Sequence, residues 1–216
     1  MHIDTLLNSV KQQAKNKDCN IILSVDSDWT QGRTLYGGIS ASLVYQAMRE
    51  SVDTDKVMRS LSTNFIGPIE ADSDFSIIVD VLRKGKNVTQ VVGRLSQANK
   101  VAVMCQASFG IARQSEVVVS NDLQHKMDYP QNPDYATQIP KVIPEFLKHF
   151  DLAKTKGGLP FTGEKDSDVH GWMRFKEQPS HFYDAHLIAL IDIWPPTVLQ
   201  LLHQPAMAST MSWNLE

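Results

Sequence analysis

"GGISASLVYQAMRE", residues 37–50, has the residue spacing of a helix that is buried along one face. Its apolar positions recur every three or four residues, as they do on one side of an α-helix. These apolar residues are Ile39, Leu43, Val44, Ala47 and Met48. Small side chains between them let another backbone approach closely; they are Gly38, Ser40, Ala41 and Ser42. The stretch therefore predicts a helix against which a sheet packs.

Strand-like segments follow this helix, and no second helix lies between them. They are "MRSLSTNFIG" (58–67), "DFSIIVDVLR" (74–83), "NVTQVVGRLSQ" (87–97) and "KVAVMCQASFGIA" (100–112). The short connections "KGKN" and "QANK" are typical of hairpin turns, so the later strands are expected to be antiparallel neighbours. We predict an α+β fold in which one central helix is wrapped by a curved antiparallel sheet.

The remainder of the chain indicates a second, shorter copy of this unit. We divide the chain into an N-terminal unit (1–112), a linker (113–165) and a C-terminal unit (166–216). The linker is rich in proline and polar residues, with one short helix expected around "PEFLKHF". After it come a strand at 168–177, a helix at 185–203 and a strand at 207–216, with the pair Ser62-Thr63 recurring as Ser209-Thr210. Since only one strand fits after the second helix, we expect an incomplete second unit.

Composition excludes several classes of function. The chain has 216 residues, a net charge of −3 and no lysine or arginine block of the kind that binds nucleic acid. It has no apolar run long enough to span a membrane, and we predict a cytoplasmic protein. The two cysteines, Cys19 and Cys105, lack a zinc-ligand spacing and are expected to be reduced and buried. Neither paired histidines nor a phosphate- or dinucleotide-binding motif occurs, so no metal and no cofactor is expected.

Asp192 stands in the apolar run "HLIALIDIWPPTVLQLL", residues 186–202. Because prolines favour the first turn of a helix, "DIWPP" predicts a helix that begins just after Asp192. Two interpretations stay open: the carboxylate caps the helix, or it is a general base that activates water. In the second case Thr210 on the next strand would help to hold the water. Helix amides or the backbone near Gly37 and Gly38 would stabilise an oxyanion.

Several motifs together resemble the bacterial acyl-CoA thioesterase II type of the double hotdog superfamily. They are Arg-x-x-x-Gly-Gly at 33–38, Phe-x-x-Pro at 65–68, Arg-Lys-Gly-Lys at 83–86, Ala-Ser-Phe at 107–109 and "HLIALIDIWPPTVL" with "ASTMSW". The resemblance implies two hotdog units, each an antiparallel sheet wrapped around a helix, that lie side by side and pool their sheets. It also implies hydrolysis of acyl-CoA to a free fatty acid and coenzyme A.

The resemblance assigns roles to particular residues. The family orients its water with an Asp, a Thr or Ser and a Gln; Asp192 and Thr210 fall on the first two, and the Gln has no counterpart before the chain ends. We assign Gly37, Gly38 and Trp194 to substrate binding. The position of the first unit that matches Asp192 is expected near Ile39, so that unit should lack a second active site.

Other functions remain open at this point. A hotdog module that binds acyl-CoA or fatty acyl ligands without cleaving them is the main alternative. A hotdog dehydratase or hydratase is a weaker one, because no catalytic histidine pair can be placed. An unpaired sheet edge in the second unit favours a homodimer or larger homo-oligomer.

Overall fold

The computed structural model describes residues 1–16, 20–120, 125–129 and 143–216; Cys19 therefore lies outside the described residues. Its α-helices are α1 (Ile3–Ala14), α2 (Gly37–Glu50) and α3 (Asp184–Ile191), and its 3-10 helices are η1 (Ser27–Trp29), η2 (Glu145–His149) and η3 (Thr197–Leu201). The strands are β1 (Ile21–Leu23), β2 (Thr30–Gln31), β3 (Thr34–Leu35), β4 (Lys56–Phe65), β5 (Phe75–Lys84), β6 (Val88–Gln97), β7 (Lys100–Ile111), β8 (Phe150–Lys156), β9 (His170–Phe175) and β10 (Ser212–Leu215).

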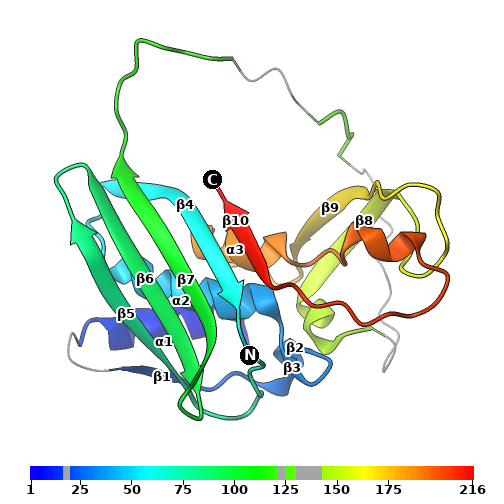
Figure 1. Cartoon of the computed structure of the whole chain (residues 1–216), viewed down its shortest axis with the longest axis horizontal. Coiled ribbons are helices and arrows are strands. Elements are labelled where there is room, and N and C mark those ends of the chain that lie inside the picture. Colours follow the sequence, from blue (N-terminus) through cyan, green and yellow to red (C-terminus); the bar gives the residue numbers. More distant parts are fainter. Residues whose placement is uncertain (17–19, 121–124, 130–142) are drawn as a thin grey trace.

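The predicted helix and its antiparallel sheet are confirmed. The sheet has the order β1-β5-β6-β7-β4-β10, and it curves around α2 (Figure 1). In β6 the residues Thr89, Val91 and Leu95 face the helix and are completely buried, while Gln90, Val92 and Arg94 on the other face are partly exposed. Gly93 of the same strand lies so near α2 that an added Cβ would meet Val44 Cγ1 at 2.6 Å. The small residue in the strand thus permits the close packing of helix and sheet.

The second unit packs along α2 through its own helix. Ser42 Oγ donates to the Ala185 carbonyl across 2.7 Å, and Tyr45 Oη donates to Asp184 Oδ2 across 2.8 Å. The start of α3 therefore lies beside the end of α2, so the two helices run antiparallel. The small residues of α2 were expected to admit a sheet, and one of them, Ser42, also faces this second helix.

Two expectations about the second unit are wrong. The segment 113–165 contains β8, which pairs with β9, in addition to the short helix η2. The proline-rich, polar composition of this region obscured that strand. The helix expected over 185–203 is instead α3 followed by η3, with Asp192 in the break between them. Proline does start η3, since Pro196 is its N-cap, but α3 has already ended at Ile191.

The two units also share a sheet. β10 pairs antiparallel with β4, with Trp213 opposite Thr63 and Leu215 opposite Leu61. β10 is the last strand of this sheet on that side. The expected pooling of the two sheets is therefore present only in part, because β10 joins the sheet of the first unit while β8 and β9 form a separate two-stranded sheet.

The N-terminal segment fastens the first unit to the second. Asp4 Oδ1 lies 2.9 Å from His186 Nε2 of α3, and Asp4 Oδ2 accepts from the backbone amide and the hydroxyl of Ser180 at 2.9 and 3.0 Å. His186 is buried, and its Nδ1 accepts from the Tyr183 amide, so Nε2 carries the proton that is donated to Asp4. These bonds hold the pKa of Asp4 below its ordinary value against the opposing effect of burial. Among the described residues, none of the helices is both long and apolar enough to cross a membrane.

Removing the Asp4 carboxylate should loosen this attachment. We expect Asp4→Ala to lower the free energy of unfolding by about 1–2 kcal/mol at pH 7, as measured by denaturant titration. Because the pKa of Asp4 is lowered in the fold, this contribution is present above about pH 4 and is lost as the pH falls further. Asp26, whose side chain is 50% exposed, is the control. Asp26→Ala should change stability by less than about 0.5 kcal/mol, and equal losses for both variants would contradict the role of Asp4.

Candidate active site

Asp192 is the C-cap of α3, with φ −89° and ψ 8°, rather than the N-cap of the helix that follows. The interpretation of Asp192 as the cap of the helix that begins after it is therefore wrong. The amide of Ile193 bonds to the Leu190 carbonyl at 3.1 Å, which tightens the last turn of α3 to a 3-10 turn. A side chain at this position projects from the carbonyl end of α3.

The Asp192 carboxylate lies against the amino end of the other helix, α2. An added Cβ at Gly37 would meet Asp192 Oδ2 at 2.8 Å, so any larger residue at position 37 would collide with the carboxylate. The backbone amide of Gly38, the next residue, interacts with the same carboxylate. The first amides of an α-helix have no partner within the helix and carry partial positive charge. The structure thus brings together Asp192, Gly37 and Gly38, which the sequence had singled out separately.

Burial dominates the electrostatics of Asp192. It raises the pKa of this carboxyl from 3.8 to about 6, while the Gly38 amide acts in the opposite direction. With a pKa of about 6, most of the molecules still carry the charge at pH 7. A carboxylate that is partly desolvated but still ionised is a stronger base than one in water.

Phe65 and Trp213 form an aromatic wall beside Asp192, a feature that the sequence analysis missed. Phe65 Cε1 lies 3.2 Å from the position of a Cβ on Gly37, and its ring stacks on Trp213 with centroids 6.1 Å apart. Phe65 ends β4 and Trp213 belongs to β10, so the wall stands where the two units join their sheets. The indole Nε1 of Trp213 is buried and has no hydrogen-bond partner among the residues that the structure describes. The Phe-x-x-Pro motif contained Phe65, but its position beside Asp192 depends on long-range pairing.

Thr210 does not lie within a strand, contrary to expectation. β10 begins at Ser212, and Thr210 precedes it as an exposed residue. The next residue, Met211, accepts a hydrogen bond from the Phe65 amide at 2.9 Å, which places this part of the chain next to the aromatic wall. In the described part of the chain, the Thr210 hydroxyl has no hydrogen bond to Asp192.

Trp194 packs elsewhere, although it follows Asp192 by two residues. Its ring lies against Gly171 of β9, where an added Cβ would meet Trp194 Cη2 at 2.8 Å. Trp194 therefore connects the break after α3 to the β8–β9 hairpin. The structure gives it a packing role there, and its assignment to substrate binding stays a prediction.

The counterpart of Asp192 in the first unit is Tyr45, and the expectation of Ile39 is wrong. α2 begins at Gly37 and α3 at Asp184, so Tyr45 and Asp192 occupy the same place along their helices. Tyr45 Oη donates to Asp184 Oδ2 at the amino end of α3, just as Asp192 faces Gly37 at the amino end of α2. At the end of the helix pair where α3 begins, the tyrosine and the carboxylate are thus hydrogen-bonded to each other. At the other end, the Asp192 carboxylate lies beside the first amides of α2.

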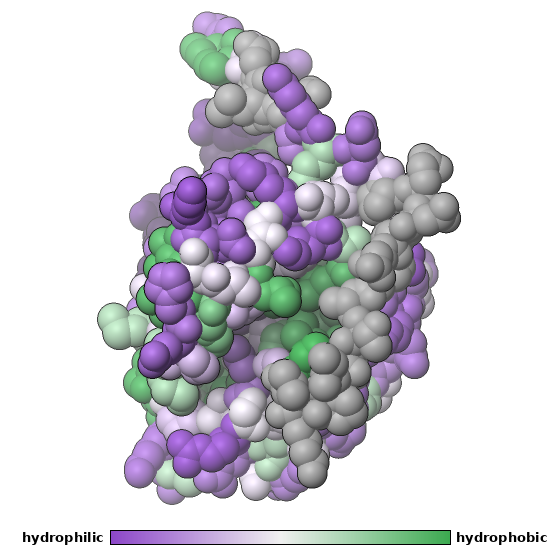
Figure 2. All heavy atoms as spheres, turned by 90° about the vertical axis from the view of Figure 1, so that its right-hand side faces the viewer, coloured by the Kyte–Doolittle hydropathy of each residue, from purple (hydrophilic) through white to green (hydrophobic). Residues whose placement is uncertain are grey.

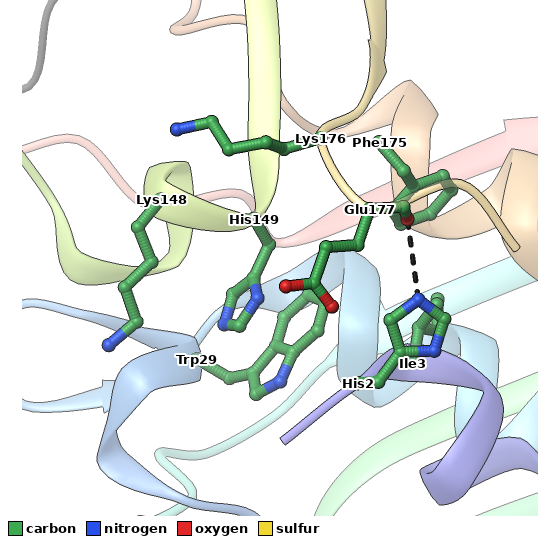
Figure 3. A pocket seen from close by; sticks show the side chains of 8 residues that line it. All are labelled: His2, Ile3, Trp29, Lys148, His149, Phe175, Lys176 and Glu177. Atoms are coloured by element: carbon green, nitrogen blue, oxygen red, sulfur yellow. Dashed lines mark hydrogen bonds between the residues drawn. The ribbon is translucent and has the colours of Figure 1, made fainter.

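A separate pocket lies at the junction of the N-terminus, η1 and η2. It has a volume of about 50 Å³, and the Glu177 carboxylate points into it between the rings of His2 and His149, above Trp29 (Figure 3). This space suffices for water but not for an acyl chain, and Asp192 does not line it. Within the described ranges no group of three or more potential metal ligands comes together.

Apolar side chains gather on the face of the molecule formed by β8, β9 and η3. This face is largely hydrophilic at its margins, and hydrophobic residues are recessed near its centre (Figure 2). Exposed apolar residues also occur on α3, where Leu187 and Ile191 are 45% and 37% exposed. Most of α2, by contrast, is buried from Gly38 to Met48, because sheet and α3 cover it from opposite sides.

Comparison with solved structures identifies the fold. A hot dog fold protein of unknown function from Alicyclobacillus acidocaldarius has a TM-score of 0.72 at 20% identity, covering 90% of this chain and 72% of its own. A provisionally named thioesterase II from Thermobifida fusca has a TM-score of 0.72 at 15% identity, with 91% and 76% covered. A provisionally named thioesterase from Novosphingobium aromaticivorans has a TM-score of 0.69 at 17% identity, with 91% and 76% covered. At these identities the likeness establishes the hotdog fold alone.

Family models match both units of the chain. No curated protein matches it. Residues 25–110 match the acyl-CoA thioesterase N-terminal domain, and residues 123–216 match the acyl-CoA thioesterase C-terminal domain. The two matches follow each other in the order of the family and together take in most of the sequence. The chain therefore belongs to the acyl-CoA thioesterase family with the double hotdog fold.

Proposed function

We propose that this protein hydrolyses acyl-CoA to a free fatty acid and coenzyme A, with Asp192 as the general base. One observation carries the proposal: a buried carboxylate with a pKa of about 6 faces the amino end of α2 at Gly37 and Gly38. A base then lies directly beside the first amides of α2. Family membership supports thioesterase chemistry for this site.

In the proposed mechanism, Asp192 accepts a proton from a water molecule as the water oxygen attacks the thioester carbonyl carbon. The carbonyl oxygen becomes an oxyanion, which the first amides of α2 stabilise through their hydrogen-bond donors and the helix dipole. The C–S bond then breaks, and the proton held by Asp192 passes to the leaving sulfur of coenzyme A. The products are the carboxylic acid and the free thiol.

Substrate binding is assigned to the residues around this space. Phe65 and Trp213 offer an apolar wall against which the first carbons of an acyl chain can pack. Gly37 carries no side chain, so the Asp192 carboxylate can lie close to the first amides of α2, where the thioester carbonyl would bind. We keep Thr210 as a candidate ligand of the attacking water, since Met211 is bonded to Phe65, and Trp194 as a candidate contact for the substrate.

Replacing Asp192 tests the proposal. Asp192→Asn should lower kcat for thiol release from a panel of acyl-CoA lengths by about 10³-fold or more, since base catalysis is lost. Asp184→Asn, at the opposite end of α3, should retain at least about half of the parent activity. In the parent, kcat/KM should rise with pH and level off above an apparent pKa of about 6, because the ionised carboxylate is the active form.

The opposing outcome points to the alternative function. If the parent releases no thiol, while acyl-CoA still raises its melting temperature, the chain is a hotdog module that binds acyl-CoA without cleaving it. Activity that survives in Asp192→Asn would reject this residue as the base while leaving thioesterase function in place.

The same residue should have a measurable effect on stability. Because the pKa of Asp192 is higher in the fold than in the unfolded chain, its charge destabilises the fold at high pH, and this penalty disappears as the pH falls through about 6 towards 4. Asp192→Asn should therefore raise the free energy of unfolding at pH 8, by up to about 3 kcal/mol at roughly 1.4 kcal/mol per pKa unit. The gain should vanish near pH 4. Denaturant titration at both pH values measures it, and equal stability of parent and variant at pH 8 would contradict the burial of this charge.

We also propose that the protein forms a homodimer or larger homo-oligomer. β10 ends its sheet with an edge that has no further strand in the described structure, and the nearby α3 exposes Leu187 and Ile191. Exposed strand edges and apolar helix faces favour association. Light scattering should give a mass of at least two chains, and a mass of one chain at micromolar concentration would refute the proposal.

A further inference from the structure

The Tyr36 hydroxyl satisfies a carbonyl at the end of α3. Tyr36 Oη donates to the Ala189 carbonyl oxygen across 2.7 Å, and both groups are buried. The last carbonyls of a helix have no partner within the helix, and burying one of them unpaired is costly. Ala189 is in this position because the Ile193 amide, which would reach it in a regular α-helix, bonds to Leu190 instead. The Tyr36 hydroxyl thus satisfies a carbonyl of the last turn of α3, which ends at Asp192.

Tyr36 is itself held from several sides. It is the N-cap of α2, and its amide donates to the Trp29 carbonyl at 2.9 Å. Its ring is completely buried and stacks on Phe146 of η2, with centroids 4.0 Å apart. The same ring occupies the space beside Gly38, where an added Cβ would meet Tyr36 Oη at 2.6 Å. One side chain is therefore fixed to the amino end of α2 and to the carbonyl end of α3.

We propose that Tyr36 is a positioning residue whose hydroxyl keeps the last turn of α3 in the form that sets the Asp192 carboxylate beside the amides of α2. The expected effect of Tyr36 on catalysis rests on the proposed function. The placement of the carboxylate is a separate, structural claim.

The turn has an alternative arrangement when the hydroxyl is absent. The Ala189 carbonyl would then lack a partner, and the Ile193 amide could bond to it in the regular i to i−4 pattern in place of the present bond to Leu190. An α-helix has 3.6 residues per turn and a 3-10 helix has 3.0. A change of the last turn of α3 from 3-10 to α geometry therefore rotates its last residues about the helix axis. Asp192 would turn away from Gly37 and towards solvent. The Tyr36 hydroxyl selects between the two arrangements.

The chain supplies matched controls for this claim. Three side-chain hydrogen bonds join α2 to α3: Tyr36 to Ala189, Ser42 to Ala185 and Tyr45 to Asp184. Tyr36→Phe, Ser42→Ala and Tyr45→Phe each remove one of them. Only the first bond lies in the turn that carries Asp192. A general effect of helix packing would appear in all three variants, and a positioning effect only in Tyr36→Phe.

The experiment measures kcat, KM, the pH profile and thermal stability for the parent and these three variants. Tyr36→Phe should lower kcat at least tenfold with KM changed less than about threefold. Its acid limb should move to lower pH, because burial is the main cause of the raised pKa of Asp192 and the carboxylate becomes more exposed. Ser42→Ala and Tyr45→Phe should stay within about twofold of the parent kcat. Replacement of Tyr36 by 4-aminophenylalanine, which retains a donor, should restore most of the activity.

A titration of the Asp192 side-chain carboxyl by ¹³C NMR separates this inference from the proposed function. The midpoint should be near pH 6 in the parent and lower in Tyr36→Phe. An inactive parent with this shift would overturn the thioesterase proposal and support Tyr36 as the positioning residue. An unchanged midpoint, or equal losses of kcat in all three variants, would overturn the role of Tyr36.

Discussion

The antiparallel contact between α2 and α3 is the constraint on which the rest of the structure depends. It sets the amino end of one helix beside the carbonyl end of the other, so that free amides and a carboxylate meet in a partly desolvated space. This contact is possible because Gly37 lacks a side chain, since an added Cβ there would lie 2.8 Å from Asp192 Oδ2. Each unit contributes one component of the proposed site, so neither unit alone would contain it.

The connections between the halves all reinforce this contact. β10 pairs with β4 and brings Trp213 onto Phe65, while the Asp4 carboxylate bonds to His186 and Ser180. These contacts involve residues that are distant in the sequence, so they form only when both units are folded and docked. The buried apolar residues of both units belong to one hydrophobic cluster, so loss of docking would separate the proposed base from the amides and open this common core.

The sequence predicted the helices and strands that show a regular pattern of apolar residues. It missed the features that depend on the packing of the two units against each other. The 3.6-residue period of 37–50 predicted a helix and the run 87–97 predicted a strand, and both elements are confirmed. The expected burial of α2 along one face only is wrong, because every residue from Gly38 to Met48 is buried. Two prolines correctly indicated a helix start, but that helix is η3, and no local signal showed that α3 ends at Asp192. The role of Tyr36 was equally hidden, because its partner Ala189 is 153 residues away. Gly37, Gly38 and Asp192 were each identified, by motif and resemblance, and only their contact had to come from the structure.

The two ends of the helix pair differ in a way that favours one site over two. At one end Tyr45 donates to Asp184, so both polar groups are satisfied. At the other end the buried carboxylate of Asp192 has a pKa raised to about 6, which means that the fold is less stable whenever this group is charged. A structure that placed such a carboxylate at both ends would bear this cost twice. A polar group kept at a destabilising position, where a hydrogen-bonded pair would satisfy the same contact, is the usual sign of function rather than folding. The asymmetry between Tyr45 and Asp192 therefore supports the proposal of a site at the Gly37 end of the helix pair, independently of the mechanism proposed for it.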